Sequence, residues 1–187
     1  CRPFDRDRCG LSPGEAGAAI VLVRGDLAPS PAITIRGWGS SNDANHMTGP
    51  SRDGSGLAQA IRTALTAARL RTDQIDYVNA HGTGTPYNDA MESAALRTVF
   101  SAACPPVSGL KGMLGHTLGA AGGVEAVICL LALEHGFMPG GLNVQTIDPA
   151  LHVNYLQHKR SAPLRRVLSN SFGFGGSNAS LVFGAAR

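Results

Sequence analysis

The chain has 187 residues, of which 43% are hydrophobic, 5% aromatic and 16% charged. That balance suits a single globular domain and excludes a coiled coil or a disordered segment, since both need a larger charged fraction. The 16 basic and 13 acidic residues leave a net charge of +3, and no long basic run with interleaved aromatic residues predicts a nucleic-acid surface.

The first third of the chain predicts two strands and a helix, with a loop before the helix. Residues 16–23 (AGAAIVLV) are apolar and predict a buried strand, and residues 33–38 predict a second strand. Residues 40–56 are polar and rich in turn-forming residues, which predicts a loop. Apolar residues at helical spacing from Leu57 then predict an amphipathic helix that ends near Leu70.

The middle of the chain predicts two short strands with a helix between them. A buried strand is expected over residues 75–80, and a helix over residues 89–100. Asn88 or Asp89 is placed to cap the first turn of that helix. Residues 105–108 predict the second strand.

Residues 124–135 predict a helix that is apolar nearly all round, which indicates the middle of a structure rather than its surface. Its longest apolar run is interrupted by Glu125 and is shorter than the roughly 20 residues that cross a bilayer, so no membrane span is expected. Strands at residues 166–170 and 179–183 follow, joined by a loop at residues 171–178. This alternation of strands and helices predicts α/β layers around one sheet.

The first loop that could carry chemistry is residues 79–86 (NAHGTGTP). His81 directly follows a predicted buried strand, and α/β sheets hold their ligands at the carboxyl ends of strands. The glycines allow a substrate to approach the backbone, while Thr83 and Thr85 add hydroxyl groups. A capped turn whose histidine is satisfied by its neighbours explains the pattern equally well.

The second loop is residues 108–123 (SGLKGMLGHTLGAAGG), where Lys111, one of only two lysines, precedes His116 by five residues. An ammonium group in apolar surroundings is unfavourable unless it is paired, and Glu125 on the following helix is a possible partner. Close packing of a core helix explains the glycines but neither Lys111 nor His116. The spacing does not match a P-loop, because no Ser or Thr follows the lysine.

The third loop is residues 170–178 (NSFGFGGSN). It precedes a strand rather than a helix, so its glycines do not predict a dinucleotide site. Two phenylalanines among glycine and asparagine favour a flexible apolar wall with free N–H groups, suited to an acyl chain and an oxyanion. A glycine-rich turn whose rings pack into the core is about equally well supported.

The four cysteines predict neither a disulfide framework nor a zinc site. Cys1, Cys9, Cys104 and Cys129 form no CxxC pair and have no histidine at zinc-finger spacing. A reducing, cytoplasmic environment is therefore expected. The chain begins with Cys1 rather than Met and no leader follows it, which indicates a piece of a longer protein.

Together the three loops resemble the β-ketoacyl-acyl carrier protein synthases, the decarboxylating condensing enzymes of the thiolase superfamily. Four long stretches carry the resemblance, in the family's order and over nearly the whole chain: RPFDRDRCGLSPGEAGAAIVLV, YVNAHGTGTPYNDAMES, VSGLKGMLGHTLGAAGGVEA and LSNSFGFGGSNASLVF. The resemblance implies a thiolase-like α/β fold, here the carboxyl-terminal half of an α/β/α/β/α layered structure with a mixed sheet. Residues 1–25 would be closing strands of the amino-terminal half, and residues 31–187 the carboxyl-terminal domain.

The resemblance implies decarboxylative condensation of acyl and malonyl thioesters, in fatty-acid or polyketide synthesis. The family's nucleophilic cysteine lies upstream of the matching segment, and neither Cys1 nor Cys9 matches its surroundings. No metal and no cofactor are implied, because the phosphopantetheine arm of an acyl carrier protein holds the substrates. The implied partners are that carrier protein, the missing amino-terminal half and a second copy in a homodimer. The alternative is a non-catalytic half or a partner similar to a chain-length factor.

The resemblance assigns a charge-stabilising role to two histidines. His81 and His116 would donate from their N–H groups to the thioester oxygen that becomes negative on decarboxylation. Lys111 would disfavour the imidazolium form of His116, and Glu125 would balance the lysine.

The resemblance assigns three further residues to the binding of substrate. The backbone N–H of Phe174 would complete an oxyanion hole, and its ring would gate the acyl pocket. Thr83 and Thr85 match the positions that bind the pantetheine arm. The remaining histidines (His46, His135, His152 and His158) are expected to be solvated or structural.

Overall fold

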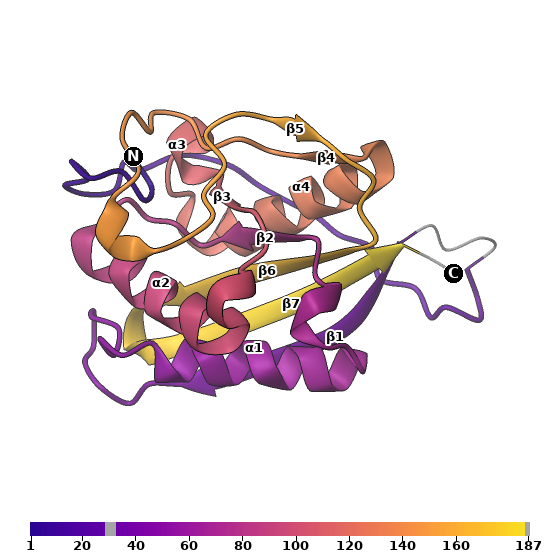
Figure 1. Cartoon of the computed structure of the whole chain (residues 1–187). Helices are drawn as coiled ribbons and strands as arrows, with labels where there is room; N and C mark the ends of the chain where they lie inside the picture. The colour runs from indigo at the N-terminus through magenta and orange to yellow at the C-terminus, as the bar shows by residue number, and fades with distance from the viewer. Residues whose placement is uncertain (29–32, 186–187) are drawn as a thin grey trace.

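The computed structural model describes residues 1–28 and 33–185. Its centre is a mixed five-stranded sheet with helices on both faces (Figure 1), which confirms the predicted α/β class. The strands lie in the order β1 (Ile33–Asn42), β7 (Ser177–Ala185), β6 (Arg166–Gly173), β2 (Tyr77–Ala80) and β3 (Val107–Gly109). The pairs β1–β7 and β7–β6 are antiparallel, whereas β6, β2 and β3 run parallel to one another.

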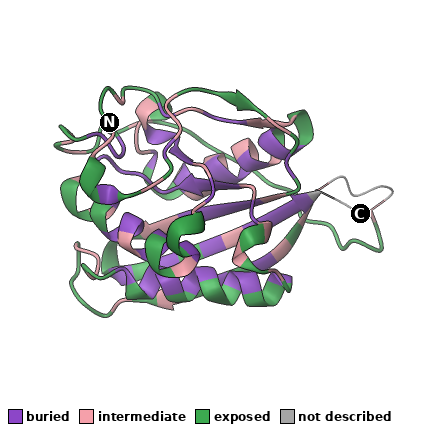
Figure 2. Ribbon diagram, viewed as in Figure 1, coloured by how far each residue is buried: buried purple, intermediate pink, exposed green. Residues whose placement is uncertain are grey.

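One face of the sheet is covered by α1 (Ser55–Ala68), with α2 (Pro86–Phe100) packed beside it. Helix α1 lies close to β1 because Gly37 and Gly39 face it. A Cβ atom at either glycine would collide with a backbone carbonyl of α1. Figure 2 shows the buried interior between this layer and the sheet, with the outer sides of the helices exposed.

The opposite face is covered by α4 (Ala121–His135), which packs against β6 and β7. Its sheet side is buried, but Leu131 on the other side is partly exposed, so the expectation of a helix surrounded by protein is wrong for this chain. Together with the preceding turn it forms an apolar helical run, Leu118–His135, long enough by length and composition to cross a membrane. A third of this run is buried, and α4 packs one of its sides against β6 and β7.

The remaining elements are short and connect the main layers. They are α3 (Lys111–Leu114), the paired strands β4 (Phe137–Met138) and β5 (Arg160–Ser161), and 3-10 turns at Thr72–Gln74, Ser101–Ala103, Leu118–Ala120, Pro149–Leu151 and Phe174–Gly176. The first ten residues pack against the Gln145–Asp148 region, where Asp5 accepts from the N–H groups of Gln145 and Thr146. The Phe4 N–H donates to Asp89, and Pro3 lies close to Gly109, so the start of the chain lies beside α2 and β3.

Residues 16–23 do not form the predicted strand. Within the described residues no neighbouring strand pairs with this segment, and Val21 is 88% exposed. An apolar sequence alone does not make a strand, because the backbone N–H and C=O groups of a strand need a partner.

Two predicted loops are shorter than expected, because their ends join the sheet. Strand β1 continues to Asn42, which pairs with Ser177. Strands β6 and β7 form a hairpin, so the predicted loop at residues 171–178 shrinks to the turn Phe174–Gly176.

Helix α2 begins earlier than predicted and without the predicted cap. Pro86 occupies its first turn and Thr85 is the N-cap, with no side-chain hydrogen bond. Proline is favoured there because the first-turn N–H groups have no partner within the helix. The carboxylate of Asp89 accepts instead from the N–H groups of Phe4 and Gly84.

Candidate active site

The predicted site residues meet where three parallel strands end. His81 follows β2 directly, Lys111 comes two residues after β3, and Ser171 and Phe172 lie near the end of β6. Because the carboxyl ends of parallel strands share one edge of a sheet, residues far apart in the sequence are brought together there.

Lys111 is the buried centre of this group and is 2% exposed. Its ammonium group forms an ion pair with Glu125, donates to the carbonyl oxygen of His81, and lies 3.3 Å from Nδ1 of the His81 ring. The second carboxylate oxygen of Glu125 accepts from the Ser171 hydroxyl at 3.3 Å. The structure thus gives the buried lysine the acidic partner that the sequence predicted.

The buried imidazole of His81 is held in one tautomer. Because Nδ1 accepts from the Lys111 ammonium, the ring proton resides on Nε2. Burial, followed by the charges of Lys111 and His116, holds the pKa of His81 well below its ordinary value. The ring lies 4.2 Å from that of Phe172 and 5.4 Å from that of His116, centroid to centroid. His81 is therefore a neutral Nε2–H donor near neutral pH.

His116 reaches the same state by a different contact. Its Nδ1 accepts from the backbone N–H of Leu118 at 3.1 Å, which leaves the proton on Nε2. Burial and, secondly, Lys111 lower the pKa of His116. Lys111 was expected to keep His116 neutral, and it does lower that pKa, but the ring that it contacts directly is that of His81.

Both histidines line an open cleft of about 900 Å³. Its walls come from β1 and the following loop, from the β6–β7 turn and from the segment before α4. Among the described residues that line the cleft, none is a cysteine. Cys129 is fully buried, and burial raises the pKa of its thiol to about 12.

The predicted binding residues differ in where they lie. Phe174 lines the cleft with a ring that is 75% exposed. Thr83 also lines the cleft, and its hydroxyl lies 2.9 Å from that of Thr85, which is outside the lining. The four remaining histidines (His46, His135, His152 and His158) are exposed.

Sequence reasoning missed the loop that follows β1. The Asp43 N–H donates to the Gly176 carbonyl at 2.8 Å, and the Gly175 N–H donates to the Met47 carbonyl at 2.7 Å. Asp43 lines the cleft and accepts from the side-chain amide of Asn178. Polar, turn-rich residues signalled only a loop, because the pairing that brings them to the Phe174 turn is long-range.

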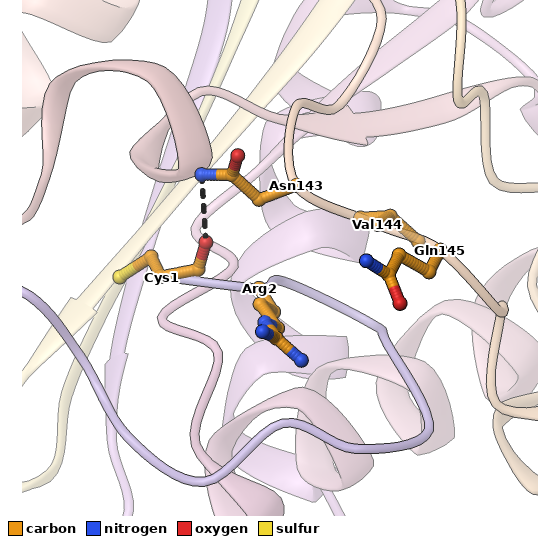
Figure 3. Close-up of a pocket in the computed structure, with 5 residues that line it drawn as sticks. All are labelled: Cys1, Arg2, Asn143, Val144 and Gln145. Carbon is orange, nitrogen blue, oxygen red and sulfur yellow. Dashed lines mark hydrogen bonds between the residues drawn. The ribbon is translucent and has the colours of Figure 1, made fainter.

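A second, smaller hollow of about 360 Å³ lies beside the start of the chain (Figure 3). It is lined by Cys1, Arg2 and residues 143–145, and the Asn143 side-chain amide donates to the Cys1 carbonyl at 3.3 Å. It shares no lining residue with the histidine cleft. The larger cleft is therefore the candidate site, because both His81 and His116 line it.

Known proteins share sequence with this chain. Residues 32–145 match the family described as "Beta-ketoacyl synthase, C-terminal domain". The chain is 45% identical to the mitochondrial 3-oxoacyl-[acyl-carrier-protein] synthase of Arabidopsis thaliana, over 97% of this chain and 42% of the relative. The chain therefore spans less than half the length of this relative.

Solved ketosynthase structures share the fold. The ishigamide ketosynthase/chain length factor superposes with a TM-score of 0.95 at 40% identity, over 100% of this chain and 47% of that one. A type II polyketide synthase acyl-carrier protein in complex with its ketosynthase, AntDE:AntF, gives 0.88 at 30% identity, over 100% and 47%. Both confirm the thiolase-like fold predicted from the motifs.

Proposed function

Because the chain belongs to the β-ketoacyl synthase family, as its carboxyl-terminal domain, we propose that it supplies part of the active site of an acyltransferase. That enzyme condenses an acyl thioester with a malonyl thioester. The observation that supports this most strongly is the pair of neutral imidazoles, each with its proton on Nε2, lining one cleft.

The pair suits the decarboxylation step. The bond between the malonyl carboxylate carbon and the methylene carbon breaks, carbon dioxide leaves, and the electron pair moves into an enolate whose oxygen becomes negative. Donors already aimed at that oxygen stabilise the transition state, each by about 3 kcal/mol. We assign this role to the Nε2–H groups of His81 and His116.

Neutral histidines also protect the product of that step. An imidazolium would readily give its proton to the enolate and so destroy the carbon nucleophile, whereas a neutral imidazole donates a hydrogen bond and keeps its proton. Burial and the Lys111 charge both disfavour the imidazolium form. In this proposal the lysine sets the tautomer of His81, and Glu125 balances the lysine.

Three residues are proposed to contact the rest of the substrate. The N–H of Phe174 would contribute to an oxyanion hole for the acyl thioester, and its exposed ring would gate the acyl pocket. Thr83 and Thr85 would bind the pantetheine arm. Their paired hydroxyls, one of them in the cleft wall, support a polar contact there.

The nucleophile is proposed to come from an amino-terminal half that this chain does not contain. In support, the described cleft wall holds no cysteine, and the chain spans less than half of its relative. We further propose a homodimeric enzyme in the cytoplasm that receives substrates from an acyl carrier protein, in fatty-acid or polyketide synthesis. The carrier complex of AntDE:AntF supports that partner class.

Release of carbon dioxide from a malonyl-carrier protein tests the proposal. With the chain and its amino-terminal half together, His81→Ala and His116→Ala should each lower the rate by about 100-fold or more. His135→Ala is the matched control, because His135 is exposed and lies outside the cleft. Equal rates in all three variants would contradict the proposal.

A non-catalytic partner is the second candidate, favoured by the similarity to a ketosynthase/chain length factor assembly. Incubation with an acyl-carrier protein donor, followed by mass spectrometry, separates the roles. No stable thioester is expected on Cys1, Cys9, Cys104 or Cys129. Co-purification with a chain that does form a thioester, but without any effect of His81→Ala, would favour the non-catalytic role.

A further inference from the structure

The carboxyl-terminal part of the chain gathers positive charge at the surface. Residues 149–187 contain no Asp or Glu, but they contain five Lys or Arg residues. Four of the five (Lys159, Arg160, Arg165 and Arg166) lie in the segment that runs from the start of β5 to the start of β6, which can be followed in Figure 1. Lys159, Arg160 and Arg165 are exposed, and Arg166 is partly exposed.

Arg36 joins these cations from β1. A Cβ atom at Gly184 would lie 2.8 Å from Cγ of Arg36 and 3.4 Å from the carbonyl oxygen of Arg165, so the Arg36 side chain lies beside that residue. We call the five cations the basic patch: Arg36, Lys159, Arg160, Arg165 and Arg166. Because Arg166 begins β6, the patch reaches the amino end of that strand, whereas the histidine cleft lies at its carboxyl end.

The charged groups of the basic patch are not neutralised by neighbouring acids. Among the described residues, none of the five cations forms a salt bridge. The Lys159 ammonium lies 4.7 Å from the centroid of the Phe137 ring, and Arg160 donates to the sulfur of Met138 at 3.5 Å. The carboxylate of Asp76 accepts from the backbone N–H groups of Arg165 and Arg166, both at 2.7 Å, and not from their guanidinium groups. The cations therefore remain able to pair with an anion from outside.

The small ribbon of β4 and β5 has an open edge beside these charges. The Ala162 N–H donates to the Gly136 carbonyl at 3.0 Å, so the backbone groups of residue 162 point toward β4. Hydrogen-bonded and non-bonded positions alternate along an antiparallel pair, so the N–H and C=O groups of Ser161 point away from β4. Ser161 is exposed, and no described strand pairs with β5 on that side. Such an edge can accept a further strand.

We propose that the basic patch and the outer edge of β5 form a docking surface for an extended, acidic segment of a partner protein. The segment adds to β5 as a strand, and its carboxylates pair with the cations of the patch. Arg160 and Arg165 are five residues apart in the sequence, so their Cα atoms lie at most about 18 Å apart. An extended segment of about six residues spans that distance. The proposal does not depend on the proposed function, because the surface lies away from the cleft.

Two other kinds of polyanion fit this surface less well. Surface binding to a membrane uses exposed apolar side chains beside the basic ones, but no large apolar side chain between residues 143 and 173 is exposed. Single-stranded nucleic acid needs aromatic faces for stacking, and the ring beside the patch, Phe137, is partly buried and already contacts Lys159. Neither ligand uses the open edge of β5. An acidic peptide uses both the edge and the charges.

Amide NMR with a hexaglutamate peptide tests the charge pairing. The peptide should move the backbone signals of Lys159, Ser161 and Arg165 more than those of other residues, and its apparent Kd should rise with salt. The triple variant Lys159→Gln, Arg160→Gln, Arg165→Gln should weaken binding by about tenfold or more. The control triple Arg6→Gln, Arg52→Gln, Arg97→Gln removes the same charge from exposed residues outside the patch and should weaken binding by less than about threefold. Equal losses in the two triples would overturn the proposal, because net charge alone would then explain the binding.

Two further comparisons test the strand and the class of partner. Hexaglutamate that is methylated at every backbone nitrogen keeps its charge but cannot donate to β5, so it should bind about tenfold more weakly. Equal binding of the two peptides would overturn strand addition. A 12-base-pair DNA duplex and phosphatidylserine vesicles, each supplied at the same concentration of negative charge, should move the Ser161 amide less than hexaglutamate does. A larger response to either would assign the surface to nucleic acid or to lipid and overturn the proposal.

Discussion

The two histidines that share the cleft are held by different kinds of structure. His81 follows a four-residue strand in which every residue is buried, and its ring contacts the ammonium of Lys111. His116 follows a short helix near the surface, and its backbone bonds to Ser12 and Gly14, about a hundred residues away in the sequence. The same tautomer is therefore fixed in His81 by a contact in the protein core, and in His116 by a loop near the surface that a second segment supports.

This difference predicts which histidine is the more easily disturbed. The segment that supports His116 leads directly into residues 16–23, an exposed apolar stretch that no strand pairs within the described residues. Segments with few buried contacts open at lower free energy than core strands. We infer that changes near residues 12–23 act on His116, whereas His81 responds to changes in the buried charges.

The largest expected effect comes from removing the cation beside His81. Lys111→Met leaves Glu125 buried without its ion-pair partner, which should lower the free energy of unfolding by about 3–5 kcal/mol. The double variant Lys111→Met with Glu125→Leu should recover most of this loss, because neither charge remains. Urea unfolding measures both. If Lys111→Met lowers the free energy of unfolding by less than about 1 kcal/mol, the ion pair with Glu125 does not stabilise the structure around His81.

A smaller and local effect is expected on the His116 side. Gly14→Ala adds a Cβ atom that would collide with the Leu114 carbonyl, so the loop must shift at a cost of about 1–3 kcal/mol. The His116 imidazole ¹⁵N shifts should move while those of His81 stay in place. Gly17→Ala is the control, because nothing lies within 4 Å of its added Cβ atom. Movement of both histidine signals in Gly14→Ala would mean that the two loops are not independent.

The pH dependence of stability should separate the histidines further. The folded-state pKa of His81 lies well below its ordinary value of 6.5. Just below pH 6.5 the imidazole is therefore protonated in the unfolded chain but neutral in the folded chain. The contribution of His81 to the free energy of unfolding is fully present above pH 6.5 and is lost as pH falls below that value. The opposite holds for Glu92, whose folded-state pKa of about 7 makes its contribution fall as pH rises from about 4.5 to 7.

Unfolding titrations from pH 5 to 8 check this. The stability difference between wild type and His81→Asn should shrink below pH 6.5, and more steeply than for His116→Asn, because His116 is less buried than His81. Parallel curves for the two variants would show that burial does not distinguish the histidines.

Local sequence was enough to predict most elements of the fold and the members of the site. The β2 strand, the helices α1, α2 and α4 and the pairing of Lys111 with Glu125 follow from periodicity, from residue chemistry and from the family motifs. The contact of Lys111 with the His81 ring was not predicted. The failures share one cause. Residues 16–23, the extension of β1 to Asn42 and the hairpin at Phe174 depend on whether a distant strand is available for pairing, which local composition does not encode.

The role of α2 was also hidden from sequence reasoning. Asp89 looked like a helix cap because it stands near a helix start, but it accepts from loop N–H groups instead. The burial of Glu92 was not predicted, because an acid inside a predicted helix usually faces solvent. In the structure Glu92 is buried and accepts from the N–H groups of His81 and Gly82. A proline in the first turn was the clue to the true helix start.

The smallest expected effect tests whether the surface loop holds His116 through backbone alone. The Leu118 side chain is 69% exposed, so Leu118→Ala should change the free energy of unfolding by no more than about 0.5 kcal/mol. The N–H that fixes the His116 tautomer belongs to the backbone and remains in the variant, so the His116 ¹⁵N shifts should stay at their wild-type values. A shift toward the other tautomer would show that the leucine side chain, packed in the cleft wall, holds the loop in place. His116 would then depend on side-chain packing much as His81 does, and the contrast between the two loops would be lost.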